Sequence, residues 1–286
     1  MRPAHYITIA AAIGLIALLY WGGNTVPPAK KNGEMPMASA EGGAHDGPHA
    51  AKAASVDSIL AASRAKLPQH AAEEVAAIEN EIKAMHDSSR MASVFTRLAK
   101  TWQQHKQMPA AAYYFAKAAK LENSEKSLNF AGQFFLDLIH DAGSQEIATW
   151  EAQEAIDCFK RALVINPDND TTKMALAASY IEGTGETMQG VQLLLGITRE
   201  KPDNVPATLM LGRLAIQSGQ FDKAIQRFET VLKIEPKNTE AMYFLAEAYK
   251  GKGNKEKAIE LFEQTKKIVN NPDFSRDIDQ YINSFK

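Results

Sequence analysis

The pattern of hydrophobic and polar positions changes twice along the chain and divides it into three parts. Residues 4–23 are apolar almost without interruption and hold no Asp, Glu, Lys or Arg. Residues 24–54 are rich in Gly, Pro, Ala and small polar residues and show no hydrophobic period. From residue 55 onward, apolar residues recur at the three- and four-residue spacing of amphipathic helices. The pattern therefore predicts an apolar segment, a flexible linker over 24–54 and a helical domain.

The apolar run near the N-terminus has the length of a membrane span. Its twenty residues, built as a helix, rise about 30 Å, which is the thickness of a bilayer's hydrocarbon core. Aromatic rings, which favour the headgroup level, stand at its two ends as Tyr6 and Trp21. A cleaved signal peptide is the alternative, but the small-residue triplet at 38–40 lies far downstream of the run. We therefore predict an uncleaved anchor over residues 1–23, with membrane contact through residues 4–23.

The charges that flank this anchor indicate its orientation only weakly. Arg2 precedes the apolar run, and Lys30 and Lys31 follow it. A short N-terminal tail is easily left in the cytoplasm while the long C-terminal part is exported. We expect that orientation, and the inverted one is its alternative.

Residues recur at a fixed offset through the C-terminal half of the chain. Four of them recur 34 residues later: Leu211 as Leu245, Ala224 as Ala258, Phe228 as Phe262 and Pro202 as Pro236. An Ala-x₃-Phe helix followed by Pro at the unit boundary is the pattern of the tetratricopeptide repeat. The helical domain resembles this family. The resemblance implies an all-α fold, a right-handed superhelical solenoid of helix hairpins that follows one N-terminal transmembrane helix and the linker.

The resemblance covers residues 92–272 and implies about five hairpins. The three clearest units span residues 170–204, 205–238 and 239–272. Two more degenerate units precede them, one over 92–123 and one that ends at Pro167.

The unit that ends at Pro167 departs from the common length. We place Phe130, Ala131 and Phe134 at its signature positions, which leaves an insertion of 12 residues within 138–153. In all five units the signature residues are expected in the core, where small side chains let two helices approach closely.

Helices are also predicted on both sides of the repeats. Residues 273–286 have apolar residues at helical spacing and are expected to form a C-terminal capping helix. Residues 55–91 read as N-terminal helices broken at Pro68. A further decayed repeat, a cap and a self-associating pair all fit these N-terminal helices.

Composition and motifs argue against catalysis, metal binding and nucleic-acid binding. Lys and Arg number 32 against 34 Asp and Glu, a net charge of −2, so no nucleic-acid partner is expected. Cys158 is the single cysteine, which excludes an internal disulfide and a thiolate zinc site. All seven histidines precede residue 141, and no His-Glu-x-x-His, Gly-x-Ser-x-Gly or phosphate-binding glycine motif occurs. We predict no enzyme activity, cofactor or metal.

In the family that this chain resembles, the first helix of each hairpin lines a concave groove that receives a peptide or a partner's helix. The resemblance places nine candidate binding residues there: Asn129, Met174, Ile181, Leu209, Arg213, Ile216, Tyr243, Glu247 and Lys250. The middle of this set is apolar, which favours an apolar extended segment or an amphipathic helix. The basic residues of a carboxylate clamp are missing, because Thr171 and Ala175 occupy their places. A capping helix of the same chain is the alternative occupant.

These observations predict a non-enzymatic, membrane-tethered scaffold that binds a partner protein or peptide. The chain is similar to membrane-anchored bacterial repeat proteins that assist the assembly or quality control of envelope proteins. That likeness implies a single-pass protein of a bacterial inner membrane with its repeats in the periplasm. The alternative function is structural, namely a self-associating protein that forms a homo-oligomer at the membrane.

Overall fold

The computed structural model describes residues 52–85 and 87–286, and this part of the chain is helical throughout, without a strand. The predicted anchor, and all but the last three residues of the predicted linker, lie outside the described residues. Among the helices that are described, none is long and apolar enough to cross a bilayer.

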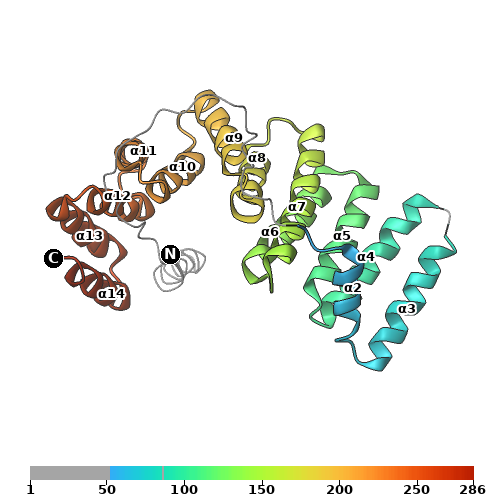
Figure 1. Cartoon of the computed structure of the whole chain (residues 1–286). Coiled ribbons are helices and arrows are strands. Elements are labelled where there is room, and N and C mark those ends of the chain that lie inside the picture. The colour runs from blue at the N-terminus through green and yellow to red at the C-terminus, as the bar shows by residue number, and fades with distance from the viewer. Residues whose placement is uncertain (1–51, 86) are drawn as a thin grey trace, which may run out of the picture. The chain divides into compact units, whose positions relative to one another are not determined.

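Ten of the described helices form five consecutive hairpins, drawn in chain order in Figure 1. The first helices of the hairpins are α4 (Ser88–Gln104), α6 (Glu125–Leu138), α8 (Asp170–Ala178), α10 (Val205–Gln217) and α12 (Thr239–Gly251). The second helices are α5 (Met108–Glu122), α7 (Gln145–Ile165), α9 (Thr187–Glu200), α11 (Phe221–Ile234) and α13 (Lys255–Val269). The expected all-helical repeat fold is confirmed, although the first hairpin begins four residues before the predicted residue 92.

Five further helical segments complete the described part. They are α2 (Val56–Arg64), α3 (Gln69–Lys83), α14 (Pro272–Asn283), the 3₁₀ segment η1 (Ile139–Asp141) and the π-helical segment η2 (Ser179–Thr184). η1 follows α6 directly, and η2 continues α8.

The first helices of the last three hairpins begin in the same way. Asn169, Asn204 and Asn238 are their N-caps, and each stands two residues after a boundary proline. Each asparagine Oδ1 accepts a hydrogen bond from the backbone N–H three residues later, at 2.8–3.0 Å. Such a cap satisfies one of the N–H groups that a helix start leaves unpaired. The Pro-x-Asn sequence therefore sets where each of these three units begins.

The hairpins form two layers of helices. First helices contact first helices, as α6 does α8 and α10 does α12, and second helices contact each other, as α5 does α7. Glycines allow the two helices of one hairpin to approach, because a Cβ on Gly212 would lie 2.5 Å from the ring of Phe228. We call the outward side of the first layer the first-helix face.

The second hairpin has a different register from the one predicted. Gly132, not Ala131, meets the ring of Phe159, as Gly212 meets Phe228 in the clearest unit. Accordingly Phe135 is fully buried, whereas Phe130 is 53% exposed. The expectation that Phe130 is a core residue was wrong, and the signature positions lie one residue later.

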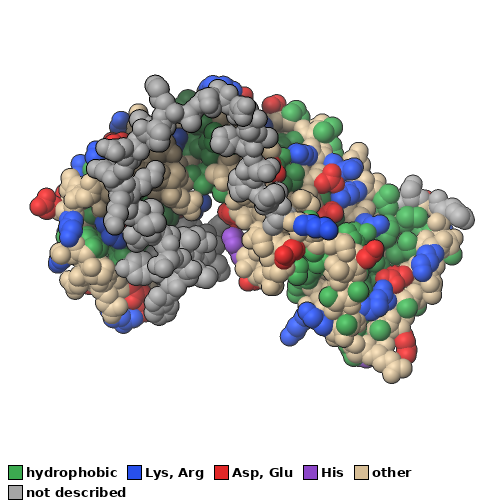
Figure 2. Space-filling model, in the orientation of Figure 1, with side chains coloured by type: hydrophobic (Ala, Val, Ile, Leu, Met, Phe, Trp, Pro, Cys, Tyr) green, Lys and Arg blue, Asp and Glu red, His purple; other side chains and the backbone are tan. Residues whose placement is uncertain are grey.

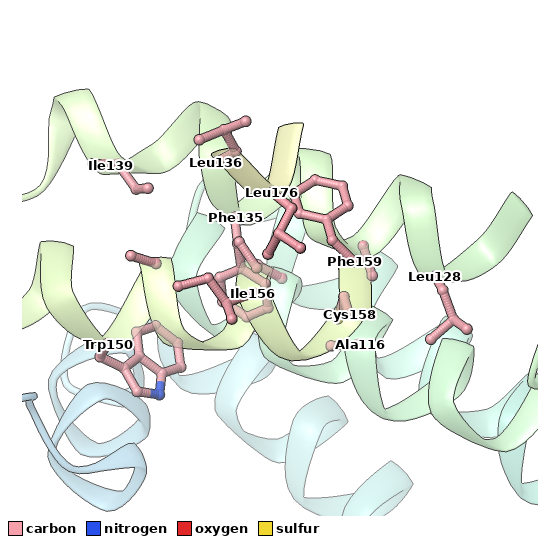
Figure 3. Close-up of a cluster of buried hydrophobic side chains, with 14 of the residues drawn as sticks. Ala116, Leu128, Phe135, Leu136, Ile139, Trp150, Ile156, Cys158, Phe159 and Leu176 are labelled. Atoms are coloured by element: carbon pink, nitrogen blue, oxygen red, sulfur yellow. The ribbon is translucent and has the colours of Figure 1, made fainter. Parts of the chain in front are cut away.

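The insertion in this hairpin forms an arm, which we define as residues 139–154. η1 makes its first side, and α7 begins at Gln145, well before the signature residue Ala155. In the core at the base of the arm, the rings of Trp150 and Phe135 meet edge to face at 5.3 Å; both residues are drawn in Figure 3. The arm therefore has a packed interior of its own.

The two N-terminal helices pack on different layers of the array. α3 contacts α4 and covers the first hairpin, with Val75 fully buried. α2 contacts α5, and the N–H of Ala54 just before it donates a 2.9 Å hydrogen bond to the carbonyl of Glu146 on α7. α3 thus acts as a cap, and α2 lies across the second helices. Their buried sides are occupied within the chain, so these sides are not free for self-association.

A network of polar side chains fastens the end of α2. The guanidinium of Arg64 binds both carboxylate oxygens of Glu79 at 2.6 and 2.8 Å. The hydroxyl of Tyr114 donates to the same carboxylate at 3.1 Å. Because burial and the nearby Glu79 carboxylate both disfavour the phenolate, the pKa of Tyr114 is raised. The network joins α2, α3 and α5.

Candidate interaction surface

The described residues offer little to a catalytic mechanism. They contain no group of three or more His, Cys, Asp or Glu side chains that could hold a metal ion. Cys158 is fully buried, and burial raises the pKa of its thiol to about 12, so a reactive thiolate is not available. A surface that binds a partner is the candidate site that the following contacts define.

The apolar candidates on the first-helix face belong to its middle. Met174 on α8 and Ile216 on α10 are half-buried, as is Ile181 on η2, whose side chain also packs against Gly190 of α9. Met210, which was not predicted, is half-buried as well. These side chains pack on the core with one part and reach solvent with the other. The structure thus provides apolar surface in the third and fourth hairpins.

Two of the predicted residues have other tasks. Leu209 is only 8% exposed and belongs to the core. The Oδ1 atom of Asn129 accepts a 2.9 Å hydrogen bond from the hydroxyl of Thr172, which joins α6 to α8. Both residues stabilise the stack and offer little surface to a partner.

The predicted residues of the last hairpin are packed against α14. The ammonium of Lys250 lies 4.2 Å from the ring centroid of Tyr281 and 5.1 Å from that of Phe285. Tyr243 contacts the ring of Phe262 at 5.3 Å, and Phe262 in turn contacts Tyr281 at 5.6 Å. The capping helix of the same chain therefore occupies this end of the face.

Glu247 completes the packing against α14. Its Oε1 atom is buried without a hydrogen-bond partner. Burial raises the pKa of this carboxyl, while Lys250 and the hydroxyl of Tyr281 act against the rise. Its neighbour along the face, Arg213, forms an exposed 3.3 Å ion pair with Glu240 and lies 5.9 Å from the ring centroid of Phe244. Of the three predicted charged residues, Arg213 is therefore the most exposed.

An exposed aromatic residue that was not predicted also lies on a first helix. Phe130 stacks on Phe134 at 6.1 Å and meets the ring of Phe115 edge to face at 5.3 Å. The one-residue error in register had placed it in the core. The Ala131-Gly132 pair, which matches Leu211-Gly212, is the sequence signal that corrects it.

Two shallow cavities lie elsewhere on the hairpins. One of about 370 Å³ is lined from α7, α8, η2 and α9 by Lys160, Leu176, Tyr180, Gln189, Gln192 and Leu193. Another of about 530 Å³ lies beside α2 and is lined by Val56, Met91, Phe95, Tyr113, Lys117, Lys120, Leu121 and Glu154. On the side shown in Figure 2, Lys and Arg side chains are interspersed with Asp and Glu over α2 to α7. Neither cavity gathers a set of convergent polar groups.

Comparisons with known proteins agree with this fold. Residues 215–276 match the model of a tetratricopeptide repeat family. PilW, titled a widely conserved type IV pilus biogenesis factor, is similar in structure with a TM-score of 0.50 and 17% identity, over 78% of this chain and 95% of that one. MamA from Desulfovibrio magneticus has a TM-score of 0.49 and 17% identity, over 66% of this chain and 99% of that one.

A comparison with curated proteins finds no sequence match. The likeness to PilW shows the fold, and the direct family match lies in the last two hairpins. Residues 215–276 therefore match the tetratricopeptide repeat, and they lie within a described part that is built throughout from helix hairpins and flanking helices.

Proposed function

We propose that the chain is a membrane-tethered scaffold that binds an apolar peptide or amphipathic helix of a partner protein on its first-helix face. The observation that carries this proposal is the apolar surface of the third and fourth hairpins, formed by Met174, Ile181 and Ile216. Half-buried apolar side chains at successive first-helix positions suit a helix-in-groove or extended mode of recognition. The exposed ring of Phe130 extends this apolar character toward the second hairpin.

The binding site belongs to the middle of the array in this proposal. Lys250 at one end is engaged by Tyr281 of α14, Tyr243 packs on Phe262 of α13, and Asn129 is engaged by Thr172. We therefore restrict the site to α8, η2 and α10, with Arg213 as the charged residue at its edge.

Charging the apolar face tests this site. We expect Met174→Glu and Ile216→Glu to abolish partner cross-linking to a photoreactive residue placed at Ile181 in cells, because a desolvated carboxylate opposes apolar contact. Val164→Glu is the matched control, since Val164 is 84% exposed and lies on the second helix α7. Helicity by circular dichroism should not change in any of the three. Cross-linking that survives both face variants would reject the site.

The tether is tested separately. The apolar run at residues 4–23 supports it, with the length of a bilayer span. We expect the full chain to resist carbonate extraction from membranes and a variant without residues 1–23 to be released. A reporter that is active only outside the cytoplasm, fused after Lys286, should be active in a bacterial host. Silence of that reporter, with a bright cytoplasmic reporter at the same position, would place the repeats in the cytoplasm.

We further propose that the partner is an envelope protein whose assembly or quality control the scaffold assists. The proposed export of the repeats supports this role, because it restricts partners to envelope and secreted proteins. The cross-linked partner identifies it directly, and a cytoplasmic protein recovered from the wild-type cross-link would contradict the role.

A further inference from the structure

The arm of the second hairpin contains a carboxyl group in an unusual place. Glu151 on α7 is 1% exposed, the lowest exposure of any charged side chain among the buried residues described. Its Oε2 atom is buried without a hydrogen-bond partner. Charged side chains are rarely buried to this degree without a partner, because the ionised form loses its hydration.

No cation in the described part of the chain neutralises Glu151. The elements that pack against α7 carry these charged or titratable groups: Asp57 and Arg64 on α2; Tyr113, Tyr114, Lys117, Lys120 and Glu122 on α5; Glu125, Lys126 and Asp137 on α6; His140 and Asp141 on η1; Asp170 and Lys173 on α8; Tyr180 and Glu182 on η2. Lys120 is paired with Glu154 and Asp157, and His140 with Glu182. Glu151 has an ion pair with none of them.

The charge of Asp141 acts repulsively on Glu151. Burial is the larger cause and the Asp141 carboxylate the smaller cause that together raise the pKa of Glu151 to about 7. The protonated carboxyl suits this site, and the carboxylate does not. Because the folded-state pKa lies above that of the unfolded chain, the stabilisation is complete below the unfolded pKa and is lost as the pH rises through about 7.

Glu151 also stands where several elements meet. Ala152, the next residue, lies so close to Gly183 of η2 that a Cβ on this glycine would be 2.1 Å from the Ala152 Cβ. Trp150, the preceding residue, packs against Phe135 of α6. A change at Glu151 therefore acts on the contacts of α7 with η1, η2 and α6 together.

We propose that Glu151 is a proton-controlled latch of the arm. With its proton bound, the carboxyl stays buried and η1 and η2 pack on α7. When the proton is lost, the carboxylate gains water only if these contacts separate, so the arm opens locally while the rest of the hairpin stays folded. The latch does not depend on the membrane tether or on the first-helix face as a binding site.

Hydrogen exchange of the full chain at about pH 5.5 and about pH 8.5 tests the latch, because the two values bracket the folded-state pKa. We expect peptides from residues 139–154 to exchange at least tenfold faster in the wild type than in Glu151→Gln at the higher pH. At the lower pH the two proteins should exchange equally. Comparison at the same pH removes the intrinsic dependence of exchange on hydroxide.

Two further variants keep the test decisive. Glu146→Gln removes an exposed charge from the same helix, and a hydrogen bond from Ser144 already lowers the pKa of this carboxyl, so it should behave as the wild type. Glu151→Met supplies a neutral side chain of similar length should the amide prevent folding. Equal exchange of the wild type and both neutral variants at the higher pH would overturn the latch, as would the same protection in Glu146→Gln.

Discussion

A methyl group added at Gly212 and one added at Gly196 should change the free energy of unfolding in opposite directions. A Cβ on Gly212 would lie 2.5 Å from the Phe228 ring, whereas a Cβ on Gly196 would meet nothing within 4 Å. We expect Gly212→Ala to lower the free energy of unfolding by about 1–3 kcal/mol through overpacking. Gly196→Ala in the interior of α9 should raise it by up to about 1 kcal/mol through helix propensity. Urea unfolding measures both, and equal stability of the two variants would contradict the packing argument.

The repeat period predicts the roles of residues that recur in successive units, but not the roles of residues that differ between units. The Pro-x-Asn starts and the small residues that face Phe228 and Phe262 repeat along the chain, so their roles follow from the period. Phe130 was wrongly placed in the core because Phe134 and Phe135 are adjacent in the second unit, and either can be aligned with Ala215 of the clearest unit. The hydrogen bond from Thr172 to Asn129 could not be foreseen, because it joins residues of different hairpins that no repeat position pairs.

At the scale of elements, α2 depends on few contacts. Ile59 is its buried apolar residue, 6% exposed, and packs into the cluster of α5 to α8. We expect Ile59→Asp to detach α2 and to raise the rate of tryptic cleavage after Arg64 and Lys66 at least tenfold, because a buried unpaired carboxylate is costly. The five hairpins should stay folded by circular dichroism. Ala61→Asp, at an exposed position of the same helix, should cleave as the wild type does.

The cap α14 depends on Tyr281, which receives Phe262 edge to face and the ammonium of Lys250 over its ring. We expect Tyr281→Ala to destabilise the last hairpin by about 1–3 kcal/mol, through lost packing and the lost cation–π contact. Thermal unfolding, monitored by hydrogen exchange of peptides from α13, measures the effect. Gln280→Ala, at the exposed neighbouring position, should leave the stability within about 0.5 kcal/mol of the wild type.

The position of α2 and the π-helical turn of η2 are the parts of the fold that sequence reasoning missed. An amphipathic stripe shows that a helix buries one side, but not which distant helix receives it. α2 skips past α3 and α4 to reach α5 and the start of α7, so no local spacing encodes its partner. Likewise, η2 forms where Gly183 packs on Ala152 of the arm. Because the sequence showed the arm only as an insertion of unknown structure, this contact could not be predicted.

For the whole molecule, nearest-neighbour stacking predicts unequal effects of equal mutations. Phe159 lies in a core that gathers residues from α2 and from α5 to η2, whereas Phe262 lies in the last hairpin. We expect Phe159→Ala to lower the protection of amides from α5 to α8 together, and Phe262→Ala to affect α12 to α14 alone. Hydrogen exchange across the array checks this. Uniform loss of protection in both variants would show that the array unfolds as one unit.

The entry point of the chain into the array has a mechanical consequence. Near the start of the described chain, the N–H of Ala54 is bound to the first turn of α7, on a different hairpin from the one that α3 covers. A pulling force applied at Ala54 would therefore act first on the contacts of α2 with α5 and with the start of α7. The single backbone hydrogen bond to Glu146 and the contacts of α2 would rupture before any hairpin bears tension. α2 would then unfold, each released residue would lengthen the chain by about 3.3–3.6 Å, and the repeats would stay folded.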